Sequence, residues 1–150
     1  AQVFMLFNPK EGKEKYRIRR SLSNLEKKKF VRIYKKNGKE VIEITNKGRK
    51  KVLQYDFEEM VIKKPKKWDG LWHVVIFDIP EKRRGARNAI GRKLKDLGFH
   101  LQKSVFVYPY ECHDEIDFVG EYFYARKYIQ YMEVKKIDKE IKLKKKFGIK

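Results

Sequence analysis

The spacing of apolar side chains changes along the first half of the chain. Residues 13–28 carry them three and four positions apart, which predicts an amphipathic helix. Residues 30–34 and 41–44 are short β-branched and aromatic runs, and the Asn37-Gly38 pair between them is typical of a tight hairpin turn. A second, basic helix is expected from residue 46 to about residue 56. The first half therefore predicts a helix, a hairpin and a helix.

The second half opens with a different pattern. Residues 71–77 form a continuous apolar run, which is typical of a strand buried on both faces, and Pro80 and Glu81 favour a helix directly after it. The later elements are extended structure, a helix and a strand, expected at residues 101–109, 114–127 and 129–137. The order β-α-β-β-α-β is that of the ferredoxin-like arrangement. The sequence therefore predicts an α+β protein with a ferredoxin-like second half.

Charge is distributed unevenly between the two halves. Residues 1–67 hold 21 Lys and Arg against 8 Asp and Glu, whereas residues 68–150 hold 18 against 12. The lysine-rich segment 63–67, with a proline at its centre, is typical of a linker between domains. The net charge of +19 attracts polyanions, and an apolar content of 41% is enough for a core. We therefore expect two domains, residues 1–67 and 68–150, and DNA as a partner.

Several classes of protein do not fit the sequence. No apolar run reaches the roughly 20 residues of a membrane-spanning helix. Residues 1–9 lack the basic flank and the cleavage site of a signal peptide. The single cysteine, Cys112, excludes an internal disulfide and a cysteine-rich zinc site, so a cytoplasmic protein is expected. Because the chain starts at Ala1 without an initiator Met, it is expected to be a piece or a trimmed form of a longer protein.

The basic helix and the hairpin follow the order of a winged helix-turn-helix from its recognition helix onward. Such a helix lies in the major groove, and the hairpin, or wing, contacts phosphates. The candidate DNA-binding residues lie on the polar face of the helix and at the hairpin tip, and they are Arg17, Arg20, Asn24, Lys27, Lys35, Lys36 and Lys39. The alternative is that the helix residues are only the solvated face of a surface helix. Since some 12 residues precede the helix, the winged helix is expected to be incomplete.

Two motifs of the second half carry a resemblance to a known family. They are Val-Val-Ile-Phe-Asp-Ile-Pro at residues 74–80 and Gln-Lys-Ser-Val-Phe-Val at residues 102–107. With the basic segment before them, they resemble PaaX-type transcriptional regulators, which contain a Cas-two-like (Cas2-like) domain named after a CRISPR-associated endonuclease. The resemblance runs from Tyr16 to the end of the chain and is strongest at residues 67–119. It implies a ferredoxin-like homodimer in which residues 137–149 add a strand to the partner's sheet.

The resemblance also implies functional residues. In nuclease members an Asp at the end of the first strand binds Mg²⁺ near the dimer axis, and Asp78 matches it as the candidate metal ligand and catalytic residue. Phe77 stands where nuclease members commonly have Tyr. Cations that contact phosphate are implied on the first helix of this half, at Arg83, Arg84 and Arg87. From the residues alone, Asp78 also fits a cap of the following helix.

Two functions from different classes fit these residues. The leading one is a dimeric DNA-binding transcriptional regulator of PaaX type, which holds duplex DNA through residues 1–67 and dimerises through residues 68–150. The alternative is an enzyme, a Mg²⁺-dependent CRISPR-associated nuclease centred on Asp78, or the adaptor subunit that joins a CRISPR integrase during spacer integration. A plain scaffold is disfavoured by the aromatic content of 14%, which indicates a folded core, and by the winged-helix pattern.

Overall fold

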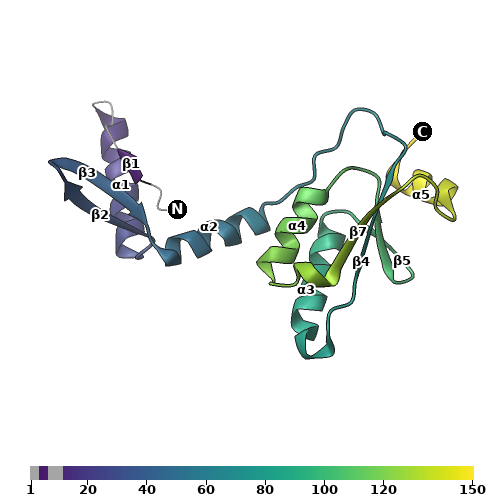
Figure 1. Ribbon diagram of the computed structural model, residues 1–150. Coiled ribbons are helices and arrows are strands. Elements are labelled where there is room, and N and C mark those ends of the chain that lie inside the picture. Colours follow the sequence, from purple (N-terminus) through teal and green to yellow (C-terminus); the bar gives the residue numbers. More distant parts are fainter. Residues whose placement is uncertain (1–3, 7–11) are drawn as a thin grey trace. The chain divides into compact units, whose positions relative to one another are not determined.

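The computed structural model describes residues 4–6 and 12–150 (Figure 1). The chain divides into two compact units, residues 1–58 and residues 59–150. The lysine-rich segment 63–67 lies in the second unit, outside any helix or strand. Within the described ranges, no helix combines the length and the apolar character that crossing a membrane requires.

The first unit is a three-stranded antiparallel sheet with two helices. Its strands, in the order β1-β3-β2, are β1 (Phe4–Leu6), β2 (Val31–Lys36) and β3 (Lys39–Ile44). Helix α1 (Lys13–Lys27) precedes the hairpin of β2 and β3, and helix α2 (Asn46–Glu58) follows it. The predicted turn is confirmed, because Asn37 and Gly38 both have positive φ, 53° and 75°, as a type I′ turn requires. The sequence predicts the hairpin and both helices, but not β1.

Thr45 joins the start of α2 to the end of α1. Its hydroxyl donates to the carbonyl oxygen of Lys29 at 2.7 Å and accepts the backbone N–H of Gly48 at 3.0 Å, which caps the first turn of α2. A glycine is needed at position 48, because a Cβ there would lie 2.1 Å from the carbonyl oxygen of Phe30. These contacts fix the angle at which α2 leaves the hairpin.

The second unit is built on a four-stranded antiparallel sheet, so the fold is α+β. Its strands, in the order β5-β6-β4-β7, are β4 (Trp72–Phe77), β5 (His100–Gln102), β6 (Val105–Tyr108) and β7 (Ile129–Val134). Its helices are α3 (Arg84–Asp96), α4 (His113–Tyr122) and α5 (Glu140–Phe147). Single 3₁₀ turns at Glu81–Arg83 and Arg126–Tyr128 precede α3 and β7. Strand β4 lies inside the sheet, between β6 and β7, as its continuous apolar run predicts.

Helices cover both faces of this sheet (Figure 1). Side chains alternate along β4, and Val75 faces the same side as Phe106 of β6. Helix α3 packs on this side, since a Cβ added to Gly91 would meet the Phe106 ring at 3.7 Å. Helix α5 covers the opposite side through Leu143, which is only 2% exposed. Leu143 belongs to a buried cluster with Trp72, Val74 and Val107.

The C-terminal segment differs from the prediction. Residues 137–149 are predicted to form a strand, but they contain helix α5, and β7 ends at Val134 rather than at Ile137. Leu143 and Phe147 are four residues apart on α5 and both pack on the chain's own sheet. The segment therefore packs Leu143 and Phe147 within the same chain, while Ile141 stays exposed. The lysines around them obscure this helical spacing in the sequence.

Helix α4 is also shorter than predicted, since it ends at Tyr122 and not near Lys127. Tyr124 has φ of 51°, and the N–H of Ala125 donates to the carbonyl oxygen of Gly120 at 2.8 Å. A glycine usually occupies the left-handed position of such a helix end. Because a tyrosine stands there instead, no stop signal is visible in the sequence.

Candidate nucleic-acid interface

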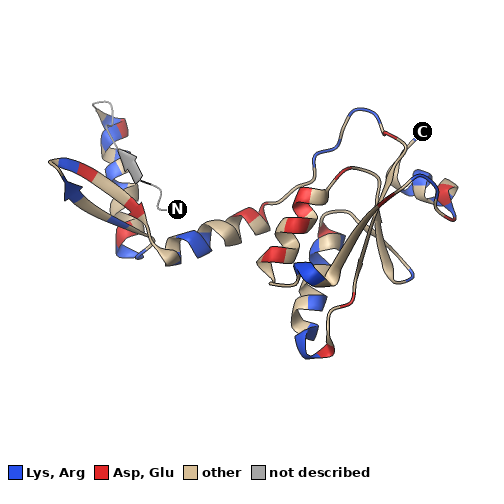
Figure 2. Cartoon of the chain, viewed as in Figure 1, with Lys and Arg blue, Asp and Glu red and all other residues tan. Residues whose placement is uncertain are grey.

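Helix α1 presents a polar face along its length, and Figure 2 shows positive charges on it. The four predicted residues on this face are all exposed, and they are Arg17, Arg20, Asn24 and Lys27. Their spacing of three and four residues places them along one side of the helix. Ile18 and Leu22, on the other side, are half-buried. None of the three cations forms an ion pair within residues 12–150, so they are available to a ligand.

The tip of the hairpin concentrates three lysines. Lys36 lies opposite Lys39 across the two strands, and Lys35 lies opposite Glu40. All three lysines are exposed. The hairpin begins directly after α1, at a turn where Lys29 has φ of 61°. The predicted helix and hairpin residues therefore belong to consecutive elements of the same unit.

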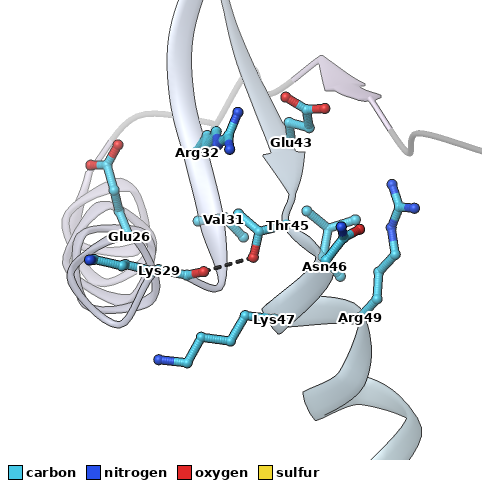
Figure 3. A pocket seen from close by; sticks show the side chains of 10 residues that line it. Glu26, Lys29, Val31, Arg32, Glu43, Thr45, Asn46, Lys47 and Arg49 are labelled. Atoms are coloured by element: carbon cyan, nitrogen blue, oxygen red, sulfur yellow. Dashed lines mark hydrogen bonds between the residues drawn. The ribbon is translucent and has the colours of Figure 1, made fainter.

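A hollow lies where α1, the hairpin and the start of α2 meet (Figure 3). Four cations line it, and they are Lys29, Arg32, Lys47 and Arg49. Two carboxylates, Glu26 and Glu43, line it as well, and Glu26 accepts the backbone N–H of Ile33 at 3.2 Å. Sequence reasoning missed these four cations, because they come from the turn after α1, from β2 and from α2, and no motif or period links them. Since they outnumber the two carboxylates, the hollow has an excess of positive charge.

Asp78 directly follows β4, and its side chain is exposed. Its backbone N–H donates to the carbonyl oxygen of Tyr128 at 3.0 Å. A helix-capping role for Asp78 is wrong, because Pro80 and Arg83 occupy the cap positions of the 3₁₀ turn and of α3, and neither start has a side-chain cap hydrogen bond. Asp78 shares a hollow with Ile76, Phe77, Ser104, Val105, Lys127, Tyr128 and Gln130. The structure thus brings residues of both motifs, among them Asp78 and Ser104, to the same place.

The surroundings of Asp78 offer a magnesium ion few ligands from one chain. Of the residues around this hollow, Asp78 alone carries a carboxylate, and Lys127 shares the hollow with it. Magnesium in proteins is usually held by one or two carboxylates together with phosphate oxygens and water, and a nearby ammonium group opposes its charge. Among the described side chains, no three of His, Cys, Asp or Glu gather in a group that could hold a metal ion.

The three arginines near the start of α3 have different surroundings. Arg83 donates to two carbonyl oxygens at the end of α4, at 2.5 and 2.7 Å, so its guanidinium ties α3 to α4. Arg84 and Arg87 lie 3.6 and 3.0 Å from the carboxylate of Glu81. Arg84 is the more exposed of these two. Contact of any of the three with phosphate stays a prediction.

A buried polar cluster lies between β4, β7 and the start of α4. His73 is 1% exposed, and its Nδ1 lies 2.5 Å from the hydroxyl oxygen of Tyr131. Burial lowers the pKa of His73. Burial also raises the pKa of the Cys112 thiol to about 12, so this thiol stays protonated at neutral pH. Both side chains belong to the core rather than to a site.

The sequence of the second unit matches a known protein family. Residues 65–145 match the family model described as the PaaX protein central Cas2-like domain. The match spans more than half of the chain and includes both motifs, at residues 74–80 and 102–107, which confirms the resemblance based on them. No curated protein matches the chain.

Proposed function

Because the chain belongs to the PaaX family with its central Cas2-like domain, we propose that it is a DNA-binding transcriptional regulator that acts in the cytoplasm. The first unit binds duplex DNA, and the second unit serves as the dimerisation body. The observation that carries the proposal is the exposed face of α1, where Arg17, Arg20 and Lys27 have no ion-pair partner among residues 12–150.

The first unit is proposed to be a partial winged helix. Its order supports this interpretation, since α1 precedes a hairpin and β1 adds a third strand beside β3. In such a module the helix enters the major groove and the hairpin tip lies along the phosphates. Asn24 then reaches base edges, as an asparagine amide pairs with adenine, while the flanking cations hold the backbone.

The second unit is proposed to have the ferredoxin-like arrangement. The order β5-β6-β4-β7 supports it, because the two strands joined by α3, and likewise the two joined by α4, are separated by one antiparallel strand. This is the split βαβ unit repeated twice. Helix α5 is an addition to that arrangement, and it covers part of the face that α3 and α4 leave open.

Charge should dominate the affinity for DNA. If about six phosphates are neutralised, the logarithm of the binding constant falls with the logarithm of the salt concentration at a slope of about −5. Fluorescence anisotropy with a labelled mixed-sequence duplex over a series of salt concentrations measures this slope. A chain that binds no duplex even at low salt would overturn the proposed function.

A homodimer is proposed to form through the part of the sheet that α5 leaves open. Ile76 and Val105 are half-buried there, and Met132, which lies opposite Val74 and so on the same face, is 37% exposed. A two-fold axis over this face would cover the same apolar surface on both protomers. The hollow around Asp78 adjoins this surface, because Ile76 and Val105 line it too.

Cleavage of DNA is not part of the proposal. Asp78 is the one carboxylate among the described residues around its hollow and has one cationic neighbour, so a single chain offers only a sparse metal site. A regulator needs only the binding surface of α1 and the hairpin. Replacement of Asp78, argued below, separates the two functions.

A further inference from the structure

A hollow at the edge of the second unit carries positive charge that neither motif predicts. It lies between the edge strand β5 and helix α5, and its lining residues are His100, Gln102, Lys139, Lys142, Leu143 and Lys146. The three lysines are exposed, while Leu143 is buried beneath them. The described lining contains no carboxylate. We call this feature the edge hollow.

Strand register and helix period bring these side chains together. His100 and Gln102 lie opposite residues of β6 that face α5, so they face the same side of the sheet. Lys142 and Lys146 are about one turn apart on α5. The side-chain amide of Gln102 donates to the carbonyl oxygen of Asp138 at 3.4 Å, which holds the segment before α5 against β5. The fold itself therefore positions the side chains that line the edge hollow.

The lysines of the edge hollow lack compensating charge. None of them forms an ion pair in the part of the chain that the structure describes, whereas Lys144 of the same helix lies 3.6 Å from Glu140. Like charges four residues apart destabilise a helix. Lys139 also has φ of 63°, a left-handed conformation that is unfavourable for residues other than glycine. Burial is the main cause that lowers the pKa of His100, and the nearby charge of Lys146 lowers it further.

We propose that the edge hollow binds phosphate groups of the DNA backbone, so that the second unit makes its own contact with the duplex. Ammonium groups, an imidazole N–H and a side-chain amide all donate to phosphate oxygens. The lysines from position 139 to position 146 extend over about 10 Å, which suits neighbouring phosphates on a strand rather than one small anion. The inference rests on the proposed function in one respect, namely that DNA is the ligand.

The test removes the charge of the edge hollow in the full chain. The variant carries Lys139→Gln, Lys142→Gln and Lys146→Gln. The slope of the logarithm of the binding constant against the logarithm of the salt concentration should become less negative by about 2 to 3. Duplex binding at low salt should weaken by roughly tenfold to a hundredfold. The matched control carries Lys64→Gln, Arg92→Gln and Lys95→Gln. These three residues are also exposed in the second unit, and they lie outside the edge hollow. The control should keep the wild-type slope.

A second readout does not depend on substituted chains. Acetylation of lysines in the wild-type chain, followed by mass spectrometry, should show Lys139, Lys142 and Lys146 protected by duplex DNA, while Lys64 and Lys95 stay reactive. Thermal melting of both variants checks that each is folded. The single change Lys142→Gln provides a milder variant if the triple change alters the melting.

The outcomes separate this inference from the proposed function. If the edge-hollow variant behaves like its control, and loss of the α1 cations still weakens binding, the inference is overturned and the proposed function stands. If the wild-type chain binds no duplex, the proposed function fails and the inference fails with it. Protection of the three lysines by vesicles of anionic lipid, but not by duplex DNA, would also overturn the inference and indicate a membrane surface instead.

Discussion

His73 is the buried residue whose protonation bears most directly on stability. Its folded-state pKa lies below the ordinary value of 6.5, because burial disfavours the charged ring. As the pH falls below about 6.5, the unfolded chain binds a proton that the folded chain does not bind, so the free energy of unfolding decreases. The stability linked to His73 is therefore complete above this range and is lost as the pH falls through it.

We expect His73→Gln to flatten this loss of stability in acid. Glutamine keeps a side-chain acceptor near Tyr131 but does not titrate in this range. Thermal melting of both chains from neutral pH to about pH 5 gives the comparison, and the wild-type chain should lose more of its melting temperature. The same decline in both chains would assign the acid sensitivity to other groups.

A substitution of Asp78, also at the scale of single residues, distinguishes DNA binding from DNA cleavage. Its side chain is exposed and forms no ion pair within the described residues, so Asp78→Asn should change the free energy of unfolding by less than about 0.5 kcal/mol. Duplex binding should also be unchanged. Incubation of both chains with single- and double-stranded substrates, with Mg²⁺, with Mn²⁺ or with chelator, tests for hydrolysis. Robust cleavage by the wild-type chain that disappears in Asp78→Asn would make the protein an enzyme.

Residue roles that depend on distant neighbours are hard to predict from the sequence. The positions of Arg17 and Arg20 follow from the helical period, and their exposed face is confirmed. Arg83 contacts the end of α4 some 40 residues away, and no local pattern indicates this contact. The edge hollow likewise combines β5 with α5, which are far apart in the chain.

At the scale of elements, period and turn chemistry predict most of the fold. The Asn37-Gly38 turn and the apolar run of β4 carry strong local signals, and both elements are present. The end of α4 carries none, because Tyr124 takes a position where glycine is usual. In the C-terminal segment, Ile141 and Leu143 suggest a strand by their alternate spacing, but packing on the sheet selects a helix.

A pair of substitutions distinguishes the helix from the predicted strand. On α5, Leu143 is 2% exposed and Ile141 is 85% exposed, whereas both would face the same side in a strand. Leu143→Ala should lower the free energy of unfolding by about 2 to 4 kcal/mol, since it leaves a cavity in the core. Ile141→Ala should change it by less than about 0.5 kcal/mol. Denaturant titration gives both values, and equal losses would contradict the helical assignment.

At the scale of the whole molecule, composition and motifs together predict the family. The two motifs identify it, and the match over residues 65–145 confirms the identification. The net charge of +19 favours a polyanionic partner, but charge alone does not say which surface binds it. That choice depends on how side chains gather in space, as they do along α1 and around the edge hollow.

The homodimer proposed to form through the second unit can be tested by one substitution that introduces a charge into the interface. Met132→Glu places a carboxylate on the open part of the sheet and should give a monomer, whereas the wild-type chain should have about twice its mass of 18.2 kDa in light scattering. Ile141→Glu is the matched control, because it adds the same charge on the outer side of α5. A monomeric wild-type chain at micromolar concentration, or a dimer that both substitutions leave intact, would count against this interface.

The central claim is that α1 is the recognition element that binds DNA, and one comparison of affinities tests it most directly. One variant carries Arg17→Ala, Arg20→Ala and Lys27→Ala, and the other carries Lys64→Ala, Arg92→Ala and Lys95→Ala, so both lose three positive charges. Anisotropy with the same duplex at the same salt should show a loss of roughly tenfold to a hundredfold for the α1 variant and less than about threefold for the other. Equal losses would mean that the net charge acts diffusely, and they would contradict the assignment of α1 as the recognition element.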